Sequence, residues 1–143
     1  MDERNTVLVC VTPQESSERL VEAGKILASK NDASLNVVSV LPVDFNNSSN
    51  EPAALEKIFE FSKQAGGEMA VYFSDEPALT VAAHISKTKP ILLVVGFPGE
   101  NSNSFISLIH LLVPDLPISM VGQDDNIYNM LPFETEFMSA KND

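Results

Sequence analysis

A glycine-containing turn after the most apolar stretch of the chain is the first candidate for binding chemistry. Residues 91–99 read ILLVVGFPG, so a predicted strand runs directly into Gly96 and Gly99. Glycine lets backbone amides approach an anion closely, and the hydroxyls of Ser102 and Ser104 would add donors at the start of the next helix. The pattern indicates half of a phosphate-binding loop.

The second half of such a loop is missing from the sequence. A loop that grips a triphosphate also needs a glycine and a hydroxyl further along the chain, where this sequence has Ile109 and His110. A Gly-x-x-Gly turn also follows many strands that bind nothing, and Ser102 and Ser104 fit the role of helix caps. The residues therefore leave a ligand site and a plain turn both open.

The elements that position this turn follow from the hydropathy pattern. Short β-rich apolar runs occur at residues 6–11, 35–41, 69–73, 91–96 and 117–122. Several are apolar at successive positions, as expected for strands covered by helices on both faces. Segments of helical period separate these runs, and such alternation predicts an α/β domain with a parallel sheet and right-handed crossovers.

Four amphipathic segments supply the predicted helices. Their expected inward stripes are Leu20, Ala23, Gly24 and Leu27; Leu55, Ile58 and Phe59; Ala78, Val81, Ala82 and Ile85; and Phe105, Leu108, Ile109 and Leu112. The first helix has two candidate starts, a capping box formed by Thr12, Pro13 and Glu15 or a cap at Ser16 or Ser17.

We expect one open, parallel five-stranded sheet in the order 3-2-1-4-5 with helices on both faces. In such a sheet, ligands bind beyond the carboxyl ends of the strands, where the strand order reverses. That crevice would lie between the first and fourth strands, with the first strand's end on one wall and residues 96–104 on the other. The candidate ligand-binding residues are Thr12, Pro13, Gly96, Gly99, Ser102 and Ser104.

Other reactive side chains give weaker signals. His84 and His110 fall on different predicted helices, and no His-x-x-x-His or Glu-x-x-His spacing indicates a metal site. The serine residues lack the Gly-x-Ser-x-Gly turn of a nucleophile elbow. Cys10 lies inside an apolar strand and is expected to be packing rather than a nucleophile. We expect no metal and no catalytic residue.

The length of 143 residues predicts one α/β domain over residues 1–123, followed by a tail over residues 124–143. The tail reads DDNIYNMLPFETEFMSAKND and mixes acids with apolar residues. One interpretation is a tail laid on its own domain. The other is a docking segment for a second subunit or another protein.

The charge balance excludes several classes of partner. Nine basic against twenty acidic residues give a net charge of −11, which would repel nucleic acid and anionic membranes. Cys10 is the only cysteine, so no intramolecular disulfide forms, and the opening MDERNTVLVC lacks the basic residues of a signal peptide. We expect a cytoplasmic location.

The order of elements, the VLVCVTP opening, the ILLVVGFPG turn and the closing LPISMV strand together resemble the universal stress protein family, over about residues 6–123. Within the family, the chain is most similar to the stress-protein-like domain of Kdp-type potassium-sensing histidine kinases. The resemblance implies a Rossmann-like fold and a homodimer that pairs through the last strand, residues 117–122. An exposed strand edge there would invite a partner strand.

The resemblance also bears on the ligand. ATP-binding members carry an aspartate after the first strand and a Gly-x-x-Gly-x9-Gly-Ser/Thr loop near the fourth, whereas this sequence has Thr12 at the first position and Ile109 and His110 at the closing pair. It therefore implies a binding or signalling module without catalysis, ATP or another cofactor. Some Kdp-type domains bind a cyclic dinucleotide through Ser-x-Ser and an aromatic motif, of which residues 102–104 match the first part.

Two alternatives stay open. The chain could be a weak nucleotide hydrolase of the same fold. It could also be a free-standing interaction partner of a kinase or transporter, using the acidic tail or the outer helices.

Overall fold

The computed structural model describes residues 5–12, 17–45, 51–97 and 104–130. The elements are β1 (Thr6–Cys10), α1 (Glu18–Lys30), β2 (Ser34–Leu41), α2 (Glu51–Gln64), β3 (Glu68–Phe73), α3 (Pro77–Thr88), β4 (Leu92–Gly96), α4 (Ser104–Leu112), β5 (Ile118–Val121) and β6 (Ile127–Met130). Strand and helix alternate up to β5, as the sequence predicts.

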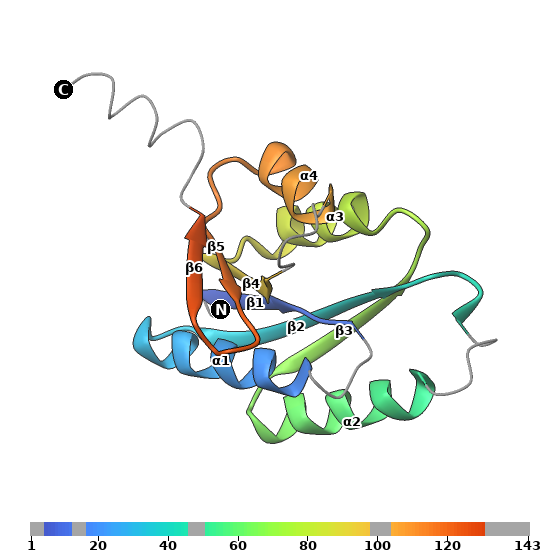
Figure 1. The fold of residues 1–143 in the computed structure, drawn as a ribbon, viewed down its shortest axis with the longest axis horizontal. Helices are drawn as coiled ribbons and strands as arrows, with labels where there is room; N and C mark the ends of the chain where they lie inside the picture. The colour runs from blue at the N-terminus through green and yellow to red at the C-terminus, as the bar shows by residue number, and fades with distance from the viewer. Residues whose placement is uncertain (1–4, 13–16, 46–50, 98–103, 131–143) are drawn as a thin grey trace.

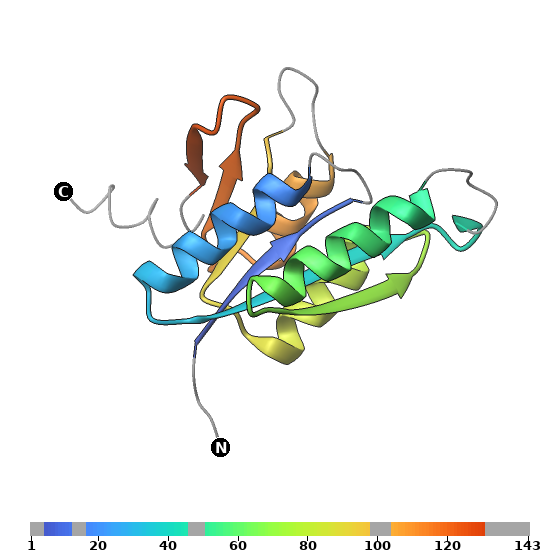
Figure 2. The ribbon, with the colours of Figure 1, turned by 90° about the horizontal axis from the view of Figure 1, so that it is seen from below.

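The strands form one sheet in the order β3-β2-β1-β4-β5-β6. The first five strands are parallel to one another. The predicted α/β class and the predicted order of these five strands are confirmed. Helices α1 and α2 cover one face of the sheet, and α3 and α4 cover the other (Figure 1, Figure 2). We name these the α1/α2 face and the α3/α4 face.

Strand β1 lies in the middle of the sheet and separates two apolar cores. Val7 and Val9 belong to the core of the α1/α2 face, and Leu8 belongs to the core of the α3/α4 face. All three side chains are fully buried. Because successive side chains of a strand point to opposite faces, a strand between two helical layers needs apolar residues at every position.

A sixth strand corrects the prediction of five. β6 pairs with β5 in the antiparallel direction. In the turn between them, the backbone N–H of Asn126 donates to the carboxylate of Asp124 over 3.1 Å, and Asp125 has a left-handed backbone with a φ of 66°. Asn and Asp favour such turns, so polar residues that the sequence analysis assigned to a tail close a β-hairpin.

The hairpin changes two expectations about the C-terminal part of the chain. Residues 127–130 of the predicted tail 124–143 belong to the sheet. The edge predicted at residues 117–122 is covered by β6, so β5 is an inner strand and β6 is the outer one. Residues 131–143 lie outside the described residues.

The start of α1 and the inward side of α2 are also settled. Ser17 is the N-cap residue of α1, which confirms the later of the two predicted starts. On α2, Ile58 is buried as predicted, but Phe59 is 46% exposed, so its predicted inward position is wrong. Ser62 takes an inward position because its hydroxyl donates to the carbonyl of Ile58 over 2.8 Å, which satisfies the buried polar group.

Helix α4 is rotated relative to the prediction. Ile109 is buried as predicted, but Leu108 and Leu112 of the predicted inward stripe are exposed, and Ile106, outside that stripe, is buried. The helix reads SFISLIHLL and carries apolar residues on all sides, so more than one stripe has helical spacing. Periodicity alone could not select the buried one.

Candidate functional site

A cavity of about 510 Å³ lies beyond the carboxyl ends of β1 and β4, on either side of the point where the strand order reverses. We call this cavity the crevice. Thr12 and Gly96, two of the predicted site residues, are part of its lining. Its volume falls within the range of about 300–1,000 Å³ that small-molecule sites usually have.

The segment between β1 and α1 supplies hydroxyl groups to the crevice. Thr12 is exposed, whereas Ser17 is only 3% exposed. The hydroxyl of Ser17 donates to the backbone carbonyl of Thr12 over 2.8 Å and makes no capping bond to α1. Ser17 therefore ties the end of β1 to the start of α1 and does not itself cap the first backbone amides of the helix.

Arg19, in the first turn of α1, is the only cation among the described residues that line the crevice. Its Nη1 donates to the carbonyl of Gly122 over 2.8 Å and contacts the carbonyl of Val121 at 3.4 Å. These bonds join α1 to the carboxyl end of β5. The Nε of Arg19 is buried and has no hydrogen-bond partner in the part of the chain that the structure describes.

The opposite side of the crevice is apolar and aromatic. Phe97 and Phe105 line it, together with buried aliphatic side chains that include Val81 and Ile106. The ring of Phe97 stacks on Tyr128 of β6 with a centroid distance of 4.6 Å, so the hairpin supports this wall. The crevice thus joins a hydrogen-bonding side to a surface suited to a flat apolar group.

Gly96 leaves room at the end of β4. A Cβ added there would meet only the side chain of Leu20, at 3.6 Å, which is an ordinary contact. The crevice also contains Cys10, and burial raises the pKa of its thiol to about 12. Because a thiolate is the nucleophilic form, Cys10 stays protonated and unreactive near neutral pH, as predicted.

The predicted site residues are not all brought together. Ser104 is the first residue of α4; it is exposed and is not part of the crevice lining. Pro13, Gly99 and Ser102 lie outside the described residues. Arg19 was missed by the sequence analysis, and its place in the first turn of a helix that opens onto the predicted crevice was the signal that could have found it.

The positions that would complete a triphosphate loop lie on α4. The side chain of Ile109 is fully buried in the core of the α3/α4 face. His110 is half-buried, and neither residue lines the crevice. The second half of a phosphate-binding loop is therefore absent from these two positions in the structure as well as in the sequence.

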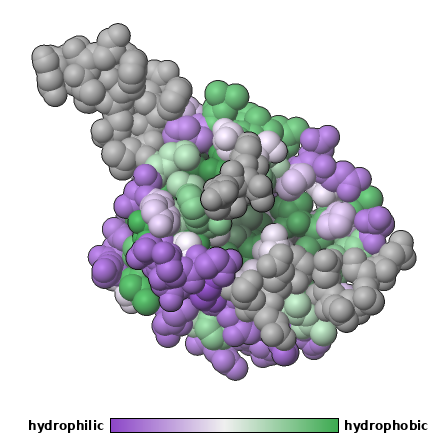
Figure 3. All heavy atoms as spheres, in the orientation of Figure 1, coloured by the Kyte–Doolittle hydropathy of each residue, from purple (hydrophilic) through white to green (hydrophobic). Residues whose placement is uncertain are grey.

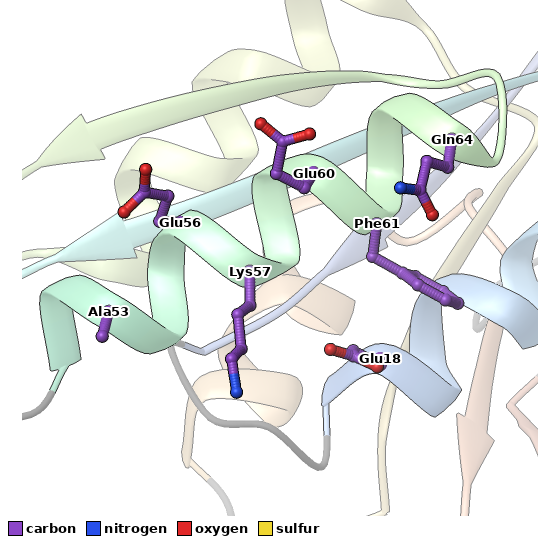
Figure 4. Close-up of a pocket in the computed structure, with 7 residues that line it drawn as sticks. All are labelled: Glu18, Ala53, Glu56, Lys57, Glu60, Phe61 and Gln64. Atoms are coloured by element: carbon purple, nitrogen blue, oxygen red, sulfur yellow. The ribbon is translucent and has the colours of Figure 1, made fainter.

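A second hollow lies between α1 and α2, but its charged groups do not converge (Figure 4). Glu56 and Glu60 extend from one side of α2, whereas Lys57 extends from the other, toward the side on which Glu18 lies. Among the described residues, no group of three or more histidine, cysteine or acidic side chains is placed to hold a metal ion.

His84 belongs to a polar chain within the α3/α4 face. Its Nδ1 lies 2.8 Å from the hydroxyl of Tyr72, and its Nε2 lies 3.0 Å from the amide oxygen of Asn36. Burial, followed by the nearby positive charge of Lys87, lowers the pKa of His84. With a neutral ring, Nε2 donates to Asn36 and Nδ1 accepts from Tyr72. His84 therefore links a helix to two strands, and it does not line the crevice.

The sequence matches no protein-family model and no curated protein. Solved structures are similar in fold. A universal stress protein family member from Burkholderia pseudomallei matches with a TM-score of 0.61 and 16% identity, over 82% of this chain and 96% of that one. A universal stress protein from Archaeoglobus fulgidus in complex with dAMP matches with a TM-score of 0.59 and 16% identity, over 82% and 97%.

A further universal stress protein, in complex with cAMP, matches with a TM-score of 0.58 and 20% identity, over 77% of this chain and 90% of that one. At these identities the likeness concerns the fold alone, an α/β fold with a largely parallel sheet that resembles these universal stress protein structures. No helix in the described ranges combines the length and the hydropathy that crossing a membrane requires.

Proposed function

We propose that this chain is a non-catalytic small-molecule-binding module of the universal stress protein type and that it does not hold ATP. The observation that carries the proposal is the crevice at the switch point of the sheet, with hydrogen-bonding groups on one side and aromatic side chains on the other. Such a site suits a compact ligand that has a flat apolar part and a polar or charged end.

The structural neighbours suggest a class of ligand. Two of them are complexes with adenine mononucleotides, cAMP and dAMP. A mononucleotide has a flat base and one phosphate, and the crevice volume of about 510 Å³ accommodates a ligand of this size. We therefore take mononucleotides as the first probes. A signalling role of the kind implied by the resemblance to Kdp-type domains would follow from such binding.

Two features support the exclusion of ATP. The family's aspartate position after the first strand is Thr12, and the closing glycine and hydroxyl of the loop are replaced by Ile109 and His110. Ile109 is buried in the core and offers no donor to a phosphate. Among the described residues of the crevice, a triphosphate would meet too few hydrogen-bond donors to offset its loss of hydration.

The lining of the crevice supports a non-catalytic role. Among the described lining residues there is no histidine and no carboxylate, which are the usual general bases. The Cys10 thiol, with its pKa raised to about 12, is not an activated nucleophile. Thr12 and Ser17 have no adjacent base within the described lining to take up their protons.

Calorimetric titration of the whole chain with cAMP, dAMP and ATP tests the proposal. We expect saturable binding of the mononucleotides and no binding of ATP, and saturable binding of ATP would contradict the proposal. Gly96→Phe would fill the crevice and should abolish binding. Lys30→Phe, which places the same side chain on an exposed position at the end of α1, should leave binding unchanged.

Two other results would contradict the proposal. One is the absence of mononucleotide binding, or equal binding by Gly96→Phe and the wild type. The other is phosphate release from ATP by the wild type that Gly96→Phe lacks, which would indicate the hydrolase alternative.

We also propose a homodimer that pairs through the last strand, which is β6 in this chain. Two side chains on this outer strand, Ile127 and Tyr128, are 45% and 42% exposed. An outer strand with apolar side chains favours pairing with a second copy. Light scattering should give a dimer mass for the wild type and a monomer mass for Ile127→Lys, and a monomer mass for both would refute the dimer.

A further inference from the structure

We infer that Arg19 is the residue by which the crevice selects an anionic ligand, a small organic phosphate such as a nucleoside monophosphate, over its neutral analogue. This inference rests on the proposed binding function of the crevice. Arg19 would act as a binding and specificity residue, with its guanidinium pairing one phosphate group.

The hydrogen bonds of Arg19 leave donors unused. A guanidinium has five N–H donors in a planar fork that matches the oxygens of a phosphate. Only Nη1 is engaged, with the carbonyls of Val121 and Gly122. Among the described residues, Nε is buried without a partner and Nη2 makes no hydrogen bond. The guanidinium is therefore fixed at one corner, and because Nε has no accessible surface, Nη2 is the nitrogen left to donate to an anion.

The charge around the crevice makes this donor distinctive. The chain has a net charge of −11, which repels anions from most of the surface. The described lining of the crevice nevertheless contains one cation and no carboxylate. No carboxylate of the described residues pairs with Arg19, so its positive charge is not neutralised within the part of the chain that the structure describes.

The start of α1 adds to this effect. Arg19 is in the first turn of a 13-residue helix, where the helix dipole is positive. Ser17 does not cap these first amides, because its hydroxyl donates to Thr12 instead. The guanidinium and these first amides thus lie at the same end of the same helix, and both favour a negative group.

A purely structural role for Arg19 predicts something different. Its bonds to the carboxyl end of β5 tie α1 to the β5–β6 hairpin. If that were its whole role, replacing Arg19 would distort the wall of the crevice and weaken the binding of every ligand to the same extent. If Arg19 selects an anion, its replacement would weaken the binding only of ligands that carry a phosphate.

Binding of cAMP, adenosine and inorganic phosphate to the whole chain separates the two roles. We expect the wild type to bind cAMP at least about tenfold more tightly than adenosine, as a charge-assisted hydrogen bond provides. Arg19→Met keeps a long side chain without the charge. This variant should lower the affinity for cAMP by about tenfold or more and change the affinity for adenosine by less than about twofold. Inorganic phosphate should displace cAMP from the wild type only at high concentration.

Two further variants complete the test. Lys25→Met removes one positive charge from an exposed position of the same helix and should leave the affinity for cAMP unchanged. Arg19→Lys keeps the charge but loses the fork, so its affinity for cAMP should be intermediate; it also serves as the test if Arg19→Met fails to fold.

The outcomes distinguish the inference from the function on which it rests. If adenosine and cAMP bind equally to the wild type, or if Arg19→Met weakens both to the same extent, the inference is wrong and the binding function stands. If Lys25→Met lowers the affinity for cAMP as much as Arg19→Met does, the effect comes from overall charge and the inference is also wrong. If neither cAMP nor adenosine binds, the proposed function itself fails.

Discussion

The two faces of the sheet bury similar apolar cores but present different surfaces to solvent. On the α1/α2 face, both helices carry acidic and basic residues on their outer sides. On the α3/α4 face, α4 has no acidic residue, no lysine and no arginine, and Leu108, Leu111 and Leu112 are 40%, 68% and 42% exposed. Apolar surface is visible over α4 at the top of Figure 3.

This contrast explains which helices reveal their buried side in the sequence alone. Charged residues on one side of α1 narrow the choice of inward side, and Leu20 and Gly24 of the predicted stripe are buried, together with Val21 and Ala28, which were not predicted. α4 lacks that constraint, and its rotation is set by which side chains fit against the sheet. The crevice lies between the two faces and draws its hydrogen-bonding groups from the α1 side and much of its apolar surface from the α3/α4 side.

The strongest test of the contrast is within α4 itself. Ile109→Ala removes a fully buried side chain and should lower the free energy of unfolding by about 2–5 kcal/mol. Leu108→Ala, on the exposed side of the same helix, should cost less than about 1 kcal/mol. Urea denaturation followed by circular dichroism measures both changes, and equal losses would mean that α4 is rotated differently.

The α1/α2 face is sensitive in another way, because α1 lies very close to β1 at Gly24. A Cβ at this position would overlap the side chain of Val9. Gly24→Val should therefore overpack the core and lower the free energy of unfolding by about 1–3 kcal/mol. Ala53→Val adds the same branched side chain at an exposed position of α2 and should cost no more than about 0.7 kcal/mol.

We expect the stability of the folded chain to depend on pH through a residue of the α3/α4 face, His84. The pKa of His84 is lowered in the folded chain, so the unfolded chain binds the proton more readily. The contribution of a neutral His84 is complete above the ordinary histidine pKa of about 6.5 and is lost as the pH falls from there toward the lowered pKa.

Thermal unfolding between pH 8 and pH 5 measures this effect, which should be smaller than that of Gly24→Val. His84→Gln cannot titrate and should show a flatter profile over the same range. An identical slope in the variant would assign the pH dependence to other groups.

The smallest expected effect on stability concerns the exposed leucines. Leu111→Lys should change the free energy of unfolding by less than about 0.5 kcal/mol, because the side chain is 68% exposed. It should shorten retention on a hydrophobic-interaction column. Ile26→Lys, at a 48% exposed position of α1, should shorten it less if the apolar surface is concentrated on the α3/α4 face.

The sequence was sufficient for the framework of this fold and insufficient for its last strand. Uninterrupted alternation of apolar strands and amphipathic helices predicted the class and the order of five strands. β6 was missed because four half-exposed residues carry little hydropathy signal. The Gly-Gln-Asp-Asp-Asn sequence before it, residues 122–126, was the available sign of a hairpin turn.

The candidate site shows a similar division. The crevice was expected where the strand order reverses, and Thr12 and Gly96 do line the cavity found there. The first-turn position of Arg19 pointed to the crevice, but its contact with a carbonyl 103 positions away in the sequence could not be predicted. Contacts of that kind depend on how α1 lies against the carboxyl end of β5, and no local pattern encodes them.

The position of β6 has a consequence for how the molecule fluctuates. Its residues are exposed or half-buried, and β5 is its one neighbour among the described strands, whereas β1 lies between β2 and β4 and has helices on both faces (Figure 1). Opening of a native structure takes place at the lowest free energy where few apolar contacts must be broken. Amide protons of β6 should therefore exchange with solvent deuterium well before those of β1, and each such opening briefly uncovers the edge of β5.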